Sequence, residues 1–177
     1  MRKKIYITFL IFICIFAFIT QRISSTSYVD INNQEQIISL IKKRTGHNTI
    51  TIQATKFKEN IYVVLYKSEE DEICLFLFEK ASFPFNNLYT YFGKASSTAT
   101  LNTYNYHNYE TNTSLIIVYG DSPKEDAASY SLEVNNILYR ENITDDKILD
   151  IFIIKDSKSS LSISTLYDSF GEIIGRF

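Results

Sequence analysis

Histidine and cysteine, which often serve as bases, nucleophiles and zinc ligands, are scarce in the chain, with two of each. Its only histidines, His47 and His107, are sixty residues apart, and a metal site would need further ligands beside one of them. Cys74 falls between Ile73 and Leu75, a setting that favours a buried, inert thiol over a nucleophile paired with histidine. We therefore expect both histidines to be surface loop residues, and no enzymatic activity, metal or cofactor.

Two groups of carboxylates are the remaining candidates for chemistry. Four consecutive acidic residues, from Glu69 to Glu72, could attract a divalent cation, but the spacing of a calcium-binding loop is absent. Asp145 and Asp146 form a similar, smaller group. Glycosidase chemistry needs two carboxylates held across a cleft, which neither group indicates. We interpret both groups as solvated turns.

Tyrosines form the one pattern that points to binding. They lie among Asn, Thr and Ser rather than in an apolar run, at Tyr89, Tyr91, Tyr104, Tyr106 and Tyr109. Tyrosine offers a rigid, amphipathic contact surface at low entropic cost, so we expect this stretch to contact a partner if the protein has one. The alternative is that these rings are ordinary strand formers that pack in the core.

Composition indicates a folded chain and argues against nucleic acid as a partner. Of 177 residues, 45% are hydrophobic, and thirteen Phe and thirteen Tyr stand against five Gly and two Pro. Such a chain has ample core material and little low-complexity sequence. The net charge is −2, without the surplus of Lys and Arg that phosphate binding requires.

The N-terminal segment has the pattern of a membrane anchor. Arg2, Lys3 and Lys4 precede an apolar run, and a helix over residues 5–20 would rise about 24 Å, close to the hydrocarbon thickness of a bilayer. We predict an anchor at residues 1–22, contacting the membrane through residues 5–20. The basic flank places the N-terminus in the cytoplasm and the rest of the chain outside. A cleaved signal peptide is the alternative, although Ser25-Thr26-Ser27, the best cleavage site, lies well past the apolar run.

A polar spacer and a short helix follow. The spacer covers residues 23–33 and ends in a residue that can cap a helix, either Asn32 or Asn33. Apolar residues then repeat at helical spacing from Gln34 to Arg44, and Gly46 can terminate the helix. The apolar residues of this helix lie on one face, so that face must pack on another element.

From residue 50 the hydrophobic pattern has a period of two, which predicts strands. The first three, Ile50–Phe57, Ile61–Lys67 and Glu72–Glu79, are joined by short polar turns and form an antiparallel meander. Both faces of the second and third strands are apolar, so the helix must cover one face and a second layer the other. We expect an edge strand at Phe83–Phe92 and a further strand within residues 95–110.

The second half of the chain also consists of short strands. Their expected positions are Leu115–Tyr119, Ser129–Val134, Ile137–Glu141, a core face at Leu149, Ile151 and Ile153, then Leu161–Tyr167 and Glu172–Phe177. Asn135-Asn136 predicts a tight hairpin. The predicted fold is α+β: a membrane helix, one short helix with an antiparallel sheet at 34–112, and a β-sandwich-like module at 113–177, packed as one unit.

Two blocks carry a resemblance: Leu115-Ile116-Ile117-Val118-Tyr119-Gly120-Asp121 and Leu166-Tyr167-Asp168-Ser169-Phe170-Gly171-Glu172-Ile173. With the Lys-rich start and the single apolar span, the chain resembles small membrane-anchored exported proteins of low-GC Gram-positive bacteria. This resemblance implies no activity. We expect a non-catalytic extracytoplasmic module that meets an envelope protein or wall polymer. The alternatives are an accessory subunit of a membrane transporter or sensor, and a secreted protein.

Overall fold

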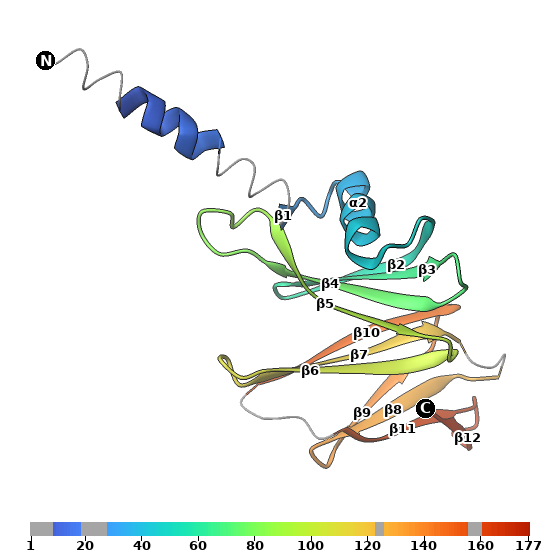
Figure 1. Cartoon of the computed structure of the whole chain (residues 1–177). Helices are drawn as coiled ribbons and strands as arrows, with labels where there is room; N and C mark the ends of the chain where they lie inside the picture. Colours follow the sequence, from blue (N-terminus) through green and yellow to red (C-terminus); the bar gives the residue numbers. More distant parts are fainter. Residues whose placement is uncertain (1–8, 19–27, 123–125, 156–160) are drawn as a thin grey trace, which may run out of the picture.

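The structure, a computed structural model, describes residues 9–18, 28–122, 126–155 and 161–177. It has a β-rich α+β fold in which helix α2 covers a stack of antiparallel sheets (Figure 1). The order of the layers, from α2 downwards in Figure 1, is a five-stranded, a three-stranded and a four-stranded sheet. The α+β class and the antiparallel meander predicted from the sequence are confirmed.

The strands of each sheet are hydrogen-bonded in a defined order. The first sheet, β1-β5-β4-β3-β2, contains β1 (Tyr28–Val29), β2 (Ile50–Lys58), β3 (Ile61–Ser68), β4 (Ile73–Lys80) and β5 (Tyr89–Ser97). The second, β10-β7-β6, contains β6 (Leu101–Asn108), β7 (Thr113–Asp121) and β10 (Lys147–Ile154). The third, β12-β11-β8-β9, contains β8 (Ser129–Val134), β9 (Ile137–Asn142), β11 (Leu161–Tyr167) and β12 (Ile173–Arg176).

Helix α2 (Gln34–Thr45) forms where the sequence predicts it. The side chain of Asn33 accepts a hydrogen bond from the backbone N–H of Gln36 at 3.1 Å, which caps the first turn. Gly46 ends the helix in the left-handed conformation, with φ 83°, and its N–H donates to the carbonyl of Lys42. Three buried side chains, Ile37, Leu40 and Ile41, attach the helix to the first sheet.

Three apolar clusters fill the spaces between the layers. The first lies between α2 and the first sheet and includes Val64 and Phe76; the second lies between the first and second sheets and includes Val63 and Leu75. Neighbouring residues of β3 and β4 thus enter different clusters, because successive side chains of a strand point to opposite faces. This explains why both faces of these strands are apolar.

The third cluster lies between the second and third sheets. Strand β7 contributes Ile116 and Val118 to it and places Ile117 in the second cluster. From β8 come Tyr130, Leu132 and Val134. The second sheet is therefore buried on both faces.

Strand β5 differs from the sequence prediction of an edge strand at Phe83–Phe92. It begins at Tyr89, and residues 81–88 form a loop closed by backbone hydrogen bonds from Phe85 to Ser82 and from Leu88 to Phe85. Strand β5 is not the edge strand of the sheet either, because β1 pairs with the start of β5 on the side away from β4. Strand β1 lies within the segment predicted as a spacer. The predicted boundary after residue 112 falls at the turn between β6 and β7, which pair along their whole length.

The predicted membrane segment lies partly outside the described residues. Residues 9–18 are helical, and their large apolar side chains are exposed, with Phe9 at 64% and Phe12 at 69%. Across the described parts of the chain, no helix is both long and apolar enough to cross a membrane.

Candidate functional site

Two of the five candidate tyrosines pack on the helix side of the first sheet. Tyr89 is 7% exposed and belongs to the first apolar cluster. The ring of Tyr91 lies 4.4 Å from that of Phe76, and the guanidinium of Arg44 sits 5.4 Å above it. These rings support the attachment of α2.

The other three tyrosines come from β6 and the turn after it. Tyr104 is half-buried against the second cluster, and burial raises the pKa of its hydroxyl. Tyr106 is 37% exposed, with its ring 5.5 Å from that of Phe92. Tyr109 is 78% exposed. The five tyrosines therefore do not gather on one surface, and only Tyr106 and Tyr109 present a substantial part of the ring to a partner.

Tyr106 lines a cavity between the first and second sheets, which we call the Tyr106 cavity. Its volume is about 160 Å³. Its apolar wall comes from four strands, through Ile61, Phe92, Leu115 and Ile153. These four side chains also belong to, or pack against, the second cluster. The cavity is thus the unfilled end of a core layer.

The rim of the Tyr106 cavity is polar. Lys155 forms an ion pair with Glu59 at 3.2 Å, and the side-chain amide of Asn60 donates to Glu79 at 3.0 Å. Thr111, exposed in the β6–β7 turn, completes this side. An apolar wall with a polar rim is the usual anatomy of a binding pocket.

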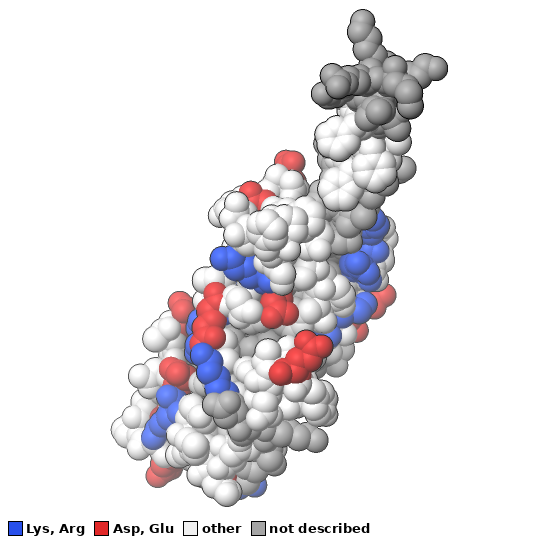
Figure 2. Space-filling model, turned by 90° about the vertical axis from the view of Figure 1, so that its left-hand side faces the viewer, with Lys and Arg blue, Asp and Glu red and all other residues white. Residues whose placement is uncertain are grey.

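Charged side chains do not separate by sign on the face drawn in Figure 2. Acidic and basic residues lie interspersed there, among larger uncharged areas. A face of this kind does not steer a strongly charged ligand towards itself over a long distance.

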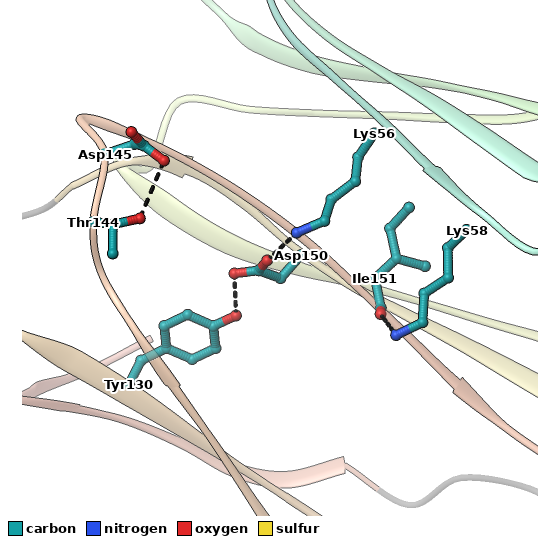
Figure 3. Close-up of polar contacts among 7 residues, drawn as sticks. All are labelled: Lys56, Lys58, Tyr130, Thr144, Asp145, Asp150 and Ile151. Carbon is teal, nitrogen blue, oxygen red and sulfur yellow. Dashed lines mark hydrogen bonds and ion pairs between the residues drawn. The ribbon is translucent and has the colours of Figure 1, made fainter.

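A second polar arrangement, the Asp150 cluster, joins the three sheets. Lys56 of β2 and Tyr130 of β8 approach the carboxylate of Asp150 from opposite sides (Figure 3), at 2.5 Å from Oδ1 and 2.6 Å from Oδ2. Nearby, Lys58 donates to the carbonyl of Ile151 at 2.6 Å. Burial, and then the bond to Asp150, raises the pKa of the Tyr130 hydroxyl. Because both carboxylate oxygens are engaged by the chain's own side chains, we assign this cluster a role in connecting the sheets.

The two histidines lie in hydrogen-bonded settings. His107 is a half-buried residue of β6 rather than a loop residue, and its Nδ1 lies 2.9 Å from the hydroxyl of Ser114. This pair has the atoms of a base and a nucleophile, but Ser114 is completely buried, so a substrate does not reach it. His47, in the loop after α2, lies 3.4 Å from the hydroxyl of Tyr66.

The acidic turn and Cys74 have structural roles. Glu69 is exposed and accepts hydrogen bonds from the backbone N–H groups of Asn48 and Thr49, which lower the pKa of its carboxyl. Cys74 is buried in the first cluster, and burial raises the pKa of its thiol. Within the described residues, no group of three or more His, Cys, Asp or Glu side chains is arranged to hold a metal ion.

The sequence indicated Tyr106 but not the cavity beside it. Ile61, Phe92, Leu115 and Ile153 are apolar residues of strands, and such residues normally fill a core. These four side chains meet at one opening only because the first sheet stacks on the second. An alternating hydrophobic pattern predicts strands but does not show which sheets stack on each other. No protein-family model, curated protein sequence or solved structure matches the chain.

Proposed function

We propose that the protein is a membrane-anchored, non-catalytic binding module, whose Tyr106 cavity receives one apolar side chain of a partner polypeptide outside the cytoplasm. The observation that carries this proposal is the cavity, an open apolar pocket with a polar rim beside an exposed tyrosine.

The size of the cavity favours a single side chain as its occupant. Pockets for small molecules generally enclose about 300–1,000 Å³, whereas an apolar cavity of about 150 Å³ accommodates benzene. At about 160 Å³, the Tyr106 cavity suits a Leu or Phe side chain. A ring or branched chain seated there would bury apolar surface on Phe92 and Leu115 while the rim bonds to the partner's backbone. A wall polymer rich in hydroxyl groups would leave that apolar surface unused.

Membrane attachment is supported by the N-terminal residues. Three basic residues precede the apolar run, and the described part of that run is a helix whose large apolar side chains are each at least half exposed. A lipid bilayer would cover this surface. The positive flank favours a cytoplasmic N-terminus and an extracytoplasmic domain.

Photocrosslinking in intact cells tests the binding site. A crosslinking residue at Thr111, on the rim, should trap a discrete partner. The same residue at Asn105, which is exposed on the opposite face of β6 from Tyr106, should not. Ile153→Phe places a larger side chain in the cavity and should abolish the crosslink from Thr111. Equal crosslinking from both positions, or a product unaffected by Ile153→Phe, would rule out the cavity as the binding site.

Exchange of the anchor separates a binding module from an accessory subunit. If residues 1–23 are replaced with an unrelated membrane anchor, the crosslink at Thr111 should persist, because the partner contacts the domain. Loss of the crosslink would favour the alternative in which the anchor itself contacts a transporter or sensor in the bilayer.

A further inference from the structure

The loop between β4 and β5, residues 81–88, carries an exposed aromatic ring that the proposed binding site does not use. Phe83 is 89% exposed, and the residues from Ala81 to Leu88 include no charged side chain. A single exposed aromatic ring is ordinary on a protein surface, so what Phe83 can contact depends on where its loop lies relative to the N-terminal segment.

This loop is fixed to the point where the chain enters the domain. The ring of Phe85 stacks on that of Tyr28 at 4.7 Å, and Tyr28 begins β1, the first described element after the N-terminal helix. Phe83 is two residues from Phe85, so their α-carbons are at most about 7.6 Å apart. Figure 1 shows the loop beside β1, at the same end of the domain as α2.

Chain length limits how far this end of the domain can lie from the bilayer. The apolar run ends at Ile19, and eight residues, from Thr20 to Ser27, separate it from Tyr28. Eight residues span at most about 29 Å even when fully extended. If the N-terminal segment is embedded, Tyr28 therefore lies no more than about 29 Å from the end of that segment, which leaves the loop within reach of the headgroups.

We propose that the loop of residues 81–88 forms a second contact with the membrane, in which the Phe83 ring inserts into the interfacial region of the bilayer. This inference rests on the anchoring in the proposed function. Lys80, exposed immediately before the loop, can meet lipid phosphates, whereas Lys43 lines a groove with Tyr28 in which Glu35 offsets its charge. The contact gives the domain two points of attachment to the membrane and so restricts its orientation.

A matched aromatic residue at the opposite end of the domain provides the control. Phe170 is 90% exposed, as Phe83 is, but it lies in the turn between β11 and β12, in the layer farthest from α2 (Figure 1). Its turn is flanked by Asp168 and Glu172, whose carboxylates disfavour an anionic membrane. Phe170 is therefore expected to stay in water.

Tryptophan fluorescence tests the contact, because the chain contains no Trp. Phe83→Trp and Phe170→Trp are each introduced into the full chain, which is reconstituted into vesicles of phosphatidylcholine and phosphatidylglycerol with or without brominated acyl chains. Circular dichroism confirms that both variants keep the strand signal. The emission of Phe83→Trp should shift to shorter wavelength and lose most of its intensity with brominated lipid. The emission of Phe170→Trp should do neither.

The possible failures are distinguishable. If the full chain does not remain with the vesicles after an alkaline wash, both the anchor and the loop contact are wrong. If the chain remains but Phe83→Trp emits as Phe170→Trp does, only the loop contact is wrong. A shift to shorter wavelength without quenching by bromine would assign Phe83 to a protein surface and overturn the lipid contact.

Discussion

In the Asp150 cluster, we expect the hydrogen bond from the buried tyrosine to stabilise the fold more than the shorter, exposed ion pair does. Tyr130 is 1% exposed and its hydroxyl lies 2.6 Å from Asp150, whereas the Lys56 side chain is 44% exposed at 2.5 Å. Hydrogen bonds to charged groups contribute about 1.5–3 kcal/mol, and exposed ion pairs about 0–1 kcal/mol. Tyr130→Phe should therefore lower the free energy of unfolding by about 2 kcal/mol, and Lys56→Met by about 0.5 kcal/mol.

Double-mutant cycles separate the two interactions. Each variant is combined with Asp150→Asn, and urea unfolding of residues 28–177 is followed by circular dichroism. The coupling energy between Tyr130 and Asp150 should be about 1–2 kcal/mol, and that between Lys56 and Asp150 about 0.5 kcal/mol or less. The Tyr130→Phe variant should also melt about 4–8 °C lower. Equal coupling energies, or a larger one for Lys56, would refute the reasoning that burial outweighs distance.

Four further predictions concern the domain and its attachment. Burial raises the pKa of the Tyr119 hydroxyl from its ordinary value of 10 to about 12. The contribution of the protonated Tyr119 to stability is therefore complete below pH 10 and is lost as the pH rises to 12. In Tyr119→Phe, the unfolding free energy should fall less steeply over this pH range. Chelator and reductant should leave the melting midpoint of residues 28–177 unchanged, and Cys74→Ala should cost about 1 kcal/mol in urea unfolding. Gly120→Ala should lower the free energy of unfolding by about 3 kcal/mol, because φ at Gly120 is 142° and a Cβ there would lie 2.0 Å from the carbonyl oxygen of Thr100. The control is Gly175→Ala, whose Cβ would lie 3.5 Å from the nearest side chain. It should change stability by less than about 0.5 kcal/mol in the same assay. Protease added to wall-stripped cells should remove a C-terminal tag, and washed membranes should retain the full-length chain; a shortened form in the medium would contradict the anchor.

Features set by neighbouring residues could be predicted from the sequence. The cap at Asn33 and the stop at Gly46 depend on a few adjacent backbone groups, and both are confirmed. Asn135 and Asn136 have positive φ values of 52° and 63°, as the tight hairpin between β8 and β9 requires. Such signals require no knowledge of the rest of the fold.

The predicted start of β5 was wrong because local and tertiary signals conflict there. Phe83 and Phe85 alternate as in a strand, but the backbone hydrogen bonds of residues 81–88 turn the chain instead. Farther along β5, Gly93 pairs with Leu77 and Tyr91 with Phe78, so Phe92 is an extra residue in the ladder. The bulge places Gly93 on the same side as Phe92, facing Leu77 and Tyr104, and the sequence pattern does not indicate its position.

The placement of the β8–β9 hairpin, between β7 and β10 in the chain but in a different sheet, has a consequence for the kinetics of folding. Pairing of Asp121 with Lys147 closes a loop of about 25 residues, whereas β2, β3 and β4 pair through short turns. Short-range hairpins form faster than long-range pairs, so in refolding experiments with pulsed hydrogen exchange the amides of β3 and β4 should become protected before those of β10. Because β10 completes the second and third clusters together, its arrival should order both of the later sheets in one step.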